Sequence, residues 1–192
     1  TLAMRSDNRL FAWGSNASGQ LGDGTTVDKS SPVLVTTASF TQISAGLSSS
    51  FAIRSDGALF AWGDNTSYQL GDGTTVPRSS IVQIGTSSYS QIHANRFTNN
   101  VFAIASDSNL LVWGDNTNFQ LGDGTTVNKS SPVQLATNYI ETSPVQIAGS
   151  WTTITTTTNT TALTQYPVAA GIKTDGSLWT WGYNVDGAVG DG

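Results

Sequence analysis

The sequence predicts an all-β repeat protein built from units of four short antiparallel strands. Three observations support this prediction. A loop of the form Trp-Gly…Gln-Leu-Gly-Asp-Gly-Thr-Thr recurs with a period of about 50 residues. Short apolar runs bounded by turn residues follow each loop in the same order. No apolar run with the helical period of about 3.6 residues continues over three turns.

The repeated loop is more consistent with scaffold than with an active site, because the same residues occupy the same place in every unit. Its copies begin at Trp13, Trp62, Trp113 and Trp181. We expect these tryptophans to be closing core residues of their blades. The structural glycines of the loop are Gly22, Gly71 and Gly122. Such glycines supply the positive φ angles that tight turns require.

Each unit contains four predicted strands. A Ser-Pro-Val run, suited to an edge strand, is followed by an alternating run led by an aromatic residue. A third apolar run, a polar Asp-Gly-like turn and a fourth run ending in tryptophan complete the unit. The chain opens with the last two runs of an earlier unit, at 2–4 and 10–13. The later strands are expected at 31–33, 40–43, 51–53, 59–62, 80–82, 89–92, 101–104, 110–113, 131–133, 151–154, 170–172 and 178–181.

This pattern predicts one propeller segment, residues 1–192, of about three and a half blades. The repeat units are 1–13 (partial), 14–62, 63–113, 114–181 (with insertions) and 182–192 (partial). Because the chain starts and stops inside a repeat, we expect further blades of the same or another chain to complete the ring. The loop itself is expected to form the joint between one blade and the next.

Four-stranded units carrying Trp-Gly-x-Asn-x-x-x-Gln-Leu-Gly-Asp-Gly resemble the regulator-of-chromosome-condensation (RCC1-type) repeat. The resemblance implies that this chain is part of a seven-bladed β-propeller. WD-type blades are shorter and carry a different signature, and kelch repeats lack this loop. The sequence departs from the family pattern at Ser49, which stands where the family usually has histidine. The single histidine, His93, aligns instead with Ser44.

Composition excludes several functions. Eight Lys and Arg residues are scattered over a chain of net charge −5, so we expect no nucleic-acid partner. No apolar stretch approaches the roughly 20 residues needed to span a bilayer, so no membrane insertion is expected. His93 has no distinctive catalytic partner, so we expect no enzyme activity.

Loop carboxylates are the only candidate metal ligands. Asp64 and Asp115 precede two of the loops, and the loop aspartates are Asp23, Asp72, Asp123 and Asp191. Calcium requires six to eight oxygen ligands, and the spacing matches no known calcium loop. We therefore expect turn hydrogen bonds rather than a metal, and no cofactor. Asn-x-Ser/Thr triplets begin at Asn16, Asn65, Asn128 and Asn159, but a chain rich in these residues produces such matches by chance.

Partner-binding residues are expected where the repeats differ, since insertions map to loops. The candidates are Arg96, Phe97, Asn99, Tyr139, Thr157, Asn159 and Tyr166. The insertion that contains the last three is expected to be a loop or an extended hairpin.

Low charge and abundant Ser, Thr and Asn favour a non-catalytic structural or protein-interaction module of a virion (phage tail, fibre or decoration protein) or of a cell-surface or secreted protein. Its partner would be a protein or a host-surface receptor, and its location extracellular or on a virion surface. The alternative, by family analogy, is a cytoplasmic regulator of a small GTPase of the guanine-nucleotide-exchange type.

Overall fold

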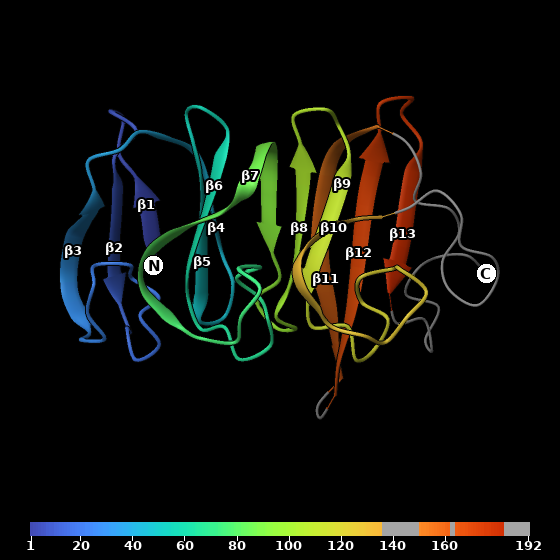
Figure 1. Ribbon diagram of the computed structural model, residues 1–192. Coiled ribbons are helices and arrows are strands. Elements are labelled where there is room, and N and C mark those ends of the chain that lie inside the picture. Colours follow the sequence, from blue (N-terminus) through green and yellow to red (C-terminus); the bar gives the residue numbers. More distant parts are fainter. Residues whose placement is uncertain (136–149, 162–163, 183–192) are drawn as a thin grey trace.

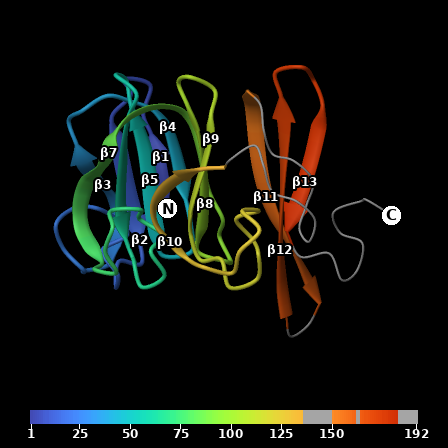
Figure 2. The ribbon, with the colours of Figure 1, turned by 45° about the vertical axis from the view of Figure 1, so that its right-hand side comes forward.

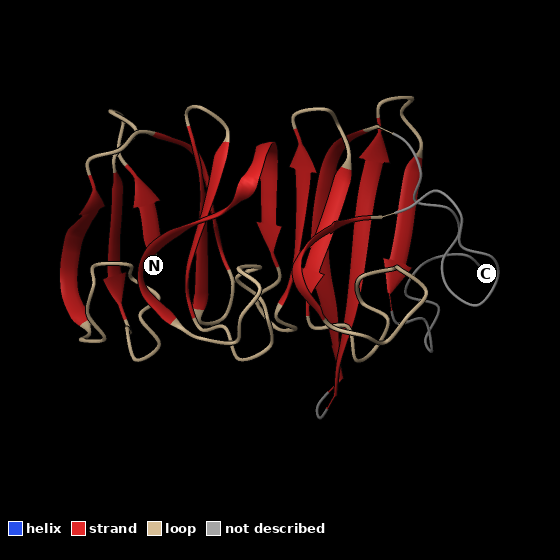
Figure 3. Ribbon diagram, viewed as in Figure 1, coloured by secondary structure: helices blue, strands red, loops and turns tan. Residues whose placement is uncertain are grey.

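The computed structural model describes residues 1–135, 150–161 and 164–182, with the side chains of 156–168 and 182 left out. The predicted all-β class is confirmed: the described residues form strands and no helix (Figure 3). The strands are β1 (Leu2–Met4), β2 (Leu10–Gly14), β3 (Lys29–Thr36), β4 (Phe40–Ala45), β5 (Ser49–Arg54), β6 (Ala58–Gly63), β7 (Arg78–Ala94), β8 (Asn100–Ala105), β9 (Leu110–Gly114), β10 (Lys129–Gln134), β11 (Trp151–Thr161), β12 (Thr164–Lys173) and β13 (Leu178–Gly182).

The strands form four consecutive blades, seen from left to right in Figure 1. Blade 1 contains β1 to β3, and blade 2 contains β4 to β6 with the first part of β7. Blade 3 contains the rest of β7 with β8 to β10, and blade 4 contains β11 to β13. All neighbouring strands are antiparallel. Partial propeller architecture is therefore confirmed.

Strand β7 differs from the sequence-based expectation of two separate runs, because it is continuous and belongs to two blades. Its first part pairs with β6, with Val82 opposite Ala61. Its second part pairs with β8, with Ile92 opposite Ala103. The outermost strand of blade 2 thus becomes the innermost strand of blade 3 without a break. Gly85, with a φ of 60°, lies between the two parts.

A separate hydrophobic core fills the space between each pair of adjacent blades. Phe40, Phe60 and Trp62 pack between blades 1 and 2, with the two phenylalanine rings edge to face at 6.1 Å. The cores between blades 2 and 3 and between blades 3 and 4 contain Trp113 and Trp181, respectively. Each blade therefore buries its faces only against its immediate neighbours, as expected of a repeat protein.

The inner strands are also linked from blade to blade by side chains. The backbone N–H of Ile92 donates to Gln42 Oε1 at 2.8 Å, and that of Ala94 donates to Ser44 Oγ at 2.9 Å. Gln91 of the same strand donates through Nε2 to the carbonyl of Thr152 in blade 4. These bonds satisfy edge groups that would otherwise be open to pairing with another chain.

The antiparallel order divides the connections between two opposite ends of the blades. We call the end with the long Trp-Gly loops the loop end; its described connections are 15–28, 46–48, 64–77, 95–99 and 115–128. The other end is the turn end, with connections 5–9, 37–39, 55–57, 106–109 and 174–177. The β11–β12 hairpin closes at the loop end, which is the lower end in Figure 1. Figure 2 shows blade 4 from a second side.

Candidate functional site at the loop end

Each of the three Trp-Gly loops that the structure describes is organised by a fully buried asparagine. In blade 2, Asn65 Nδ2 donates to Asp72 Oδ1 at 2.9 Å and to the carbonyls of Thr74 and Val76 at 2.8 and 3.3 Å. Asn65 Oδ1 accepts the backbone N–H of Leu70 at 3.0 Å. Equivalent bonds surround the buried asparagines Asn16 and Asn116.

Burial also excludes glycosylation at two of the Asn-x-Ser/Thr triplets. The Asn16 and Asn65 side chains have no exposed surface, and both ends of each amide are engaged in the loop. Neither residue can carry a glycan in the folded protein.

The loop aspartates are used by their own loops. Asp72 Oδ1 accepts the backbone N–H and the hydroxyl of Thr74 at 2.9 and 2.7 Å, and Oδ2 pairs with Arg78 at 2.6 Å. Burial by itself would raise the pKa of Asp72, but the hydrogen bonds from Thr74, Arg78 and Asn65 outweigh it and hold the pKa below its ordinary value.

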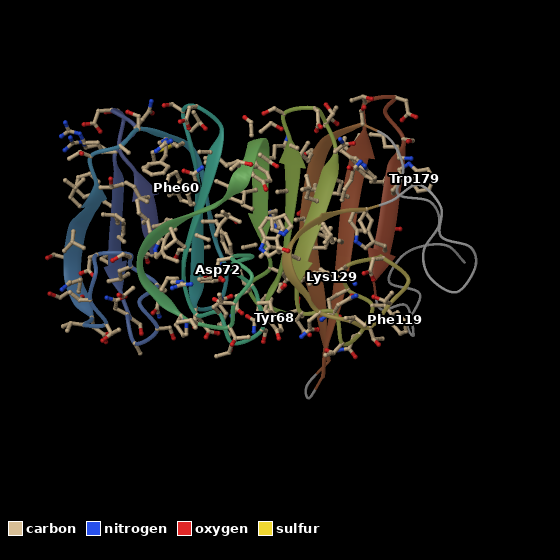
Figure 4. All side chains as sticks on the ribbon, in the orientation of Figure 1. Phe60, Tyr68, Asp72, Phe119, Lys129 and Trp179 are labelled. Carbon is tan, nitrogen blue, oxygen red and sulfur yellow. The ribbon has the colours of Figure 1, made fainter. Side chains whose placement is uncertain are left out.

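The same arrangement recurs in the neighbouring loops. Asp23 pairs with Lys29 at 3.1 Å, and Asp123 pairs with Lys129 at 2.7 Å. Figure 4 labels Asp72 and Lys129 among these residues. Within the described ranges, no group of three or more His, Cys, Asp or Glu residues could hold a metal ion. Asp191, the remaining candidate, lies outside the described residues.

The loop joins two blades through packing and not through the path of the chain. Residues 64–77, for example, link β6 to the first part of β7, and these two strands pair within blade 2. The prediction that the loop connects one blade to the next is therefore wrong for the path of the chain. Its contact with the next blade comes from Gln69, whose carbonyl accepts Trp113 Nε1 at 2.9 Å. A Cβ on Gly71, which has a φ of 76°, would lie 2.7 Å from the same nitrogen.

The other repeats place the predicted structural residues similarly. Trp62 Nε1 donates to the carbonyl of Gln20, and a Cβ on Gly22 would lie 2.7 Å from this Nε1. Gly122 has a φ of 70°. Trp181 is fully buried, although its Nε1 has no hydrogen-bond partner among the described residues. Trp13 differs in being only half-buried.

The loop end also carries exposed apolar side chains. Among the described residues, ten large hydrophobic side chains are exposed, and six of them lie in loop-end connections. These six are Val27, Leu47, Val76, Phe97, Phe119 and Val127. The other four lie within strands, and no described turn-end connection contains one. Such an asymmetry is typical of a surface that contacts another molecule.

The predicted partner-binding residues fall at this same end wherever the structure describes them. Arg96 and Phe97 are exposed in the β7–β8 connection, where Phe97 retains 49% of its surface, and Asn99 is half-buried with a φ of 50°. Next to them, the buried Asn95 Nδ2 has no hydrogen-bond partner within the part of the chain that the structure describes.

The insertion that contains Thr157, Asn159 and Tyr166 is an extended hairpin, which is one of its two predicted forms. In β11 and β12, Asn159 lies opposite Tyr166 near the hairpin tip, and Thr157 lies opposite Val168. The side chains of these residues, and Tyr139 altogether, lie outside the described residues.

Sequence analysis missed the aromatic residues of the repeated loop itself. Tyr68 and Phe119 occupy the position that is Gly19 in blade 1, and Figure 4 shows both near the lower end of the blades. Repetition of the flanking residues argued that the whole loop is scaffold. The signal that could have identified them is the change from glycine to an aromatic residue inside an otherwise repeated segment.

Features elsewhere offer less for chemistry. His93 is half-buried on β7, and burial lowers its pKa, which favours the neutral form near pH 7. Two open depressions of about 340 and 320 Å³ lie at the turn end, and Ser88 and Ser106, joined by a hydrogen bond from Ser106 Oγ to Ser88 Oγ, line both of them. The described part of the chain contains no helix long and apolar enough to cross a membrane.

Comparison with known proteins places the repeats in a family. The family model described as "Regulator of chromosome condensation (RCC1) repeat" matches residues 7–53, 56–88 and 107–154, and a second model of that description matches 40–69. The first model alone matches more than half of the chain.

Solved structures show the same fold. Human WBSCR16 is 18% identical with a TM-score of 0.70, over 95% of this chain and 44% of that protein. Yeast RCC1 (Prp20), solved bound to Kap60, is 17% identical with a TM-score of 0.75, over 100% and 43%. Prp20p from Saccharomyces cerevisiae, described with its binding properties to Gsp1p and histones, is 16% identical with a TM-score of 0.67, over 100% and 45%. The chain spans less than half of the length of each of these proteins. With its repeated loops and their family match, the chain belongs to the regulator of chromosome condensation (RCC1) repeat family.

Proposed function

We propose that this chain is a non-catalytic protein-interaction module that binds a protein partner through the loop end of its blades. The observation that carries the proposal is the distribution of exposed apolar side chains: among the described residues, six of the ten lie in loop-end connections and none lies in a turn-end connection. Apolar side chains gathered on one end of a protein gain free energy when a partner removes them from water.

The way in which these side chains are held supports recognition. The carbonyl of Val76 accepts Asn65 Nδ2, and its N–H donates to Thr74 Oγ1 at 3.2 Å. Val27 and Val127 are held by equivalent bonds. Because the backbone on both sides is already ordered, little conformational entropy remains to be lost when a partner binds.

A regulator of a small GTPase is a second candidate, and the comparisons favour it over a virion or cell-surface role. One matched yeast protein is described by its binding to Gsp1p and histones. None of the three solved structures named above is described as a virion or surface component. In this second reading the module would act in the cytoplasm or nucleus.

Site-specific photocrosslinking tests the interaction proposal. A photoreactive phenylalanine analogue replaces Val76 at the loop end or, as the matched control, the exposed Ser55 at the turn end. In cells that express the whole protein, we expect the Val76 position to crosslink to a partner protein, with competition by unlabelled protein, and the Ser55 position to give none. Crosslinking from Ser55 alone would contradict the proposal.

Nucleotide release separates the two candidates. A small GTPase from the same cells is loaded with fluorescent GDP, and release is followed with and without the whole protein. The interaction proposal expects an unchanged rate. Acceleration that loop-end substitutions abolish would favour the regulator.

A further inference from the structure

Two neighbouring blades present the same set of side chains at the loop end. The blade 2 patch consists of Leu47, Asp64, Tyr68 and Val76. The blade 3 patch consists of Phe97, in the longer β7–β8 connection, with Asp115, Phe119 and Val127 at the places that correspond to Asp64, Tyr68 and Val76. Each patch therefore combines an exposed apolar residue, a carboxylate, an aromatic ring and an exposed valine.

Backbone hydrogen bonds hold each patch together. The N–H of Asp64 donates to the carbonyl of Ser48 at 2.8 Å, which joins the connection of Leu47 to the Trp-Gly loop. In blade 3 the N–H of Asp115 donates to the carbonyl of Asn99 at 3.1 Å. The two patches are thus equivalent constructions on successive blades.

The aromatic rings are not required by the loop backbone. Gly19, Tyr68 and Phe119 have φ angles of 78°, 64° and 61°, and each makes the same two backbone hydrogen bonds in its loop. Glycine adopts this conformation freely, whereas aromatic residues rarely do. Gly19 shows that the loop forms without a side chain at this position. The rings of Tyr68 and Phe119 therefore serve something other than loop closure.

The carboxylates of the two patches carry negative charge that no described cation neutralises. Asp64 accepts from Gln69 Nε2 at 2.6 Å and from the Thr66 hydroxyl at 3.1 Å, both neutral donors. Asp115 accepts from the corresponding Gln120 and Thr117 groups. In contrast, Asp72 of the same loop is paired with Arg78. In each loop the carboxylate and the aromatic residue stand four residues apart in the sequence. Together they suit a guanidinium or ammonium group, through an ion pair and a cation–π contact.

From these observations, and resting on the proposed function, we infer that the blade 2 and blade 3 patches together bind a protein segment that carries two basic side chains, each next to an apolar one. Linking two weak contacts raises the overall affinity because the second contact forms within the complex. Arg96, exposed beside Phe97, adds a positive charge to the blade 3 patch. The blade 2 patch is therefore expected to contribute more to the affinity for the basic side chains.

Synthetic peptides test this inference on the whole protein. A tandem peptide contains two Arg-Leu pairs joined by a Gly-Ser linker, in versions of different linker length, and a single peptide contains one pair. We expect the best tandem peptide to bind at least about tenfold more tightly than the single peptide in fluorescence anisotropy. Asp64→Asn should reduce the tandem affinity to about that of the single peptide, with a smaller loss for Asp115→Asn. The turn-end control, Asp107→Asn, should leave the affinity unchanged.

Phe119→Asn tests the role of the ring, because asparagine tolerates a positive φ. We expect the melting temperature to stay within about 3 °C of the parent protein and the tandem affinity to fall by about fivefold. Equal binding of tandem and single peptides, an equal loss with Asp107→Asn, or unchanged affinity of Phe119→Asn would overturn the inference. If Val76 still crosslinks to a partner protein when the peptides fail, the proposed function stands and only the basic character of the partner is wrong.

Discussion

The two ends of the blades use similar polar residues in different surroundings. At the turn end, Arg54 pairs with Asp56 across a short hairpin, and both side chains are open to solvent. At the loop end, Arg78 pairs with Asp72, whose side chain is only 10% exposed and is also bonded to a buried asparagine. The turn end only closes strands. The loop end contains an internal hydrogen-bonded framework that can keep apolar side chains exposed to solvent.

Loop length explains this difference. A turn of three to five residues has no interior, so its polar groups face solvent and its sequence stays polar. The long Trp-Gly loop encloses its own buried amide, which bonds to three backbone groups of the loop. Residues such as Val76 can then be exposed without loosening the loop. Buried scaffold residues and exposed apolar residues therefore occupy different positions of one repeated segment.

Removal of the buried amide is expected to have the largest effect. Asn65→Ala leaves the N–H of Leu70 and the carbonyl of Thr74 unsatisfied in the interior and should lower the free energy of unfolding by about 3–4 kcal/mol. Asp56→Ala at the turn end should lower it far less, because solvent replaces the lost contacts. Urea denaturation of both variants measures the difference. Equal losses would show that the loop framework has no special role.

Two glycines of one loop separate backbone strain from contact with the next blade. Gly71 and Gly73 have φ angles of 76° and 81°, but a Cβ would meet Trp113 only at Gly71 and nothing within 4 Å at Gly73. We expect Gly73→Ala to destabilise the protein by about 1–2 kcal/mol and Gly71→Ala by about 3 kcal/mol or more. Thermal and urea unfolding test the order. A reversed order would contradict the close packing of loop and tryptophan.

Acid should weaken the loop framework. The pKa of Asp72 is lowered in the folded protein, so its contribution to stability is present above the ordinary aspartate pKa and is lost as pH falls through the lower folded value. Stability should thus be nearly level above about pH 5 and fall below about pH 4. Asp72→Asn should be less stable at pH 7 and lose less between pH 5 and pH 3. The same pH slope in both proteins would show that this carboxylate does not carry the dependence.

The smallest effect on stability is expected for an exposed side chain of the loop end. Val76→Ser should change the free energy of unfolding by less than about 0.5 kcal/mol, because the side chain is exposed and the backbone bonds remain. The same substitution should weaken partner binding, measured by competition with the photocrosslinked parent protein. Loss of stability together with binding would place Val76 in the framework instead of on the surface.

The sequence was sufficient to predict the strands because their apolar runs are short, alternating and repeated. The run from Phe51 to Ile53 lies inside β5, and the run from Leu59 to Trp62 lies inside β6. The continuity of β7 could not be predicted, because the polar stretch around Gly85 has the composition of a turn. The repeat period of the sequence does not show that one strand pairs within two different blades.

The candidate site could be predicted only where the repeats differ in length. The insertion beside Phe97 was visible in the sequence, and the structure places it at the exposed loop end. Tyr68 and Phe119 stand in a segment of constant length, so repetition concealed them. Burial separates Asn65 from its neighbour Tyr68, and burial inside an irregular loop cannot be read from periodicity.

Hydrogen–deuterium exchange of the whole protein, with and without the partner recovered by crosslinking, tests the central claim that the loop end is the bound surface. We expect the partner to slow exchange in residues 95–99 and 115–119 and to leave 55–57 and 106–109 unchanged. Protection of the turn-end segments with unchanged exchange at the loop end would contradict the account.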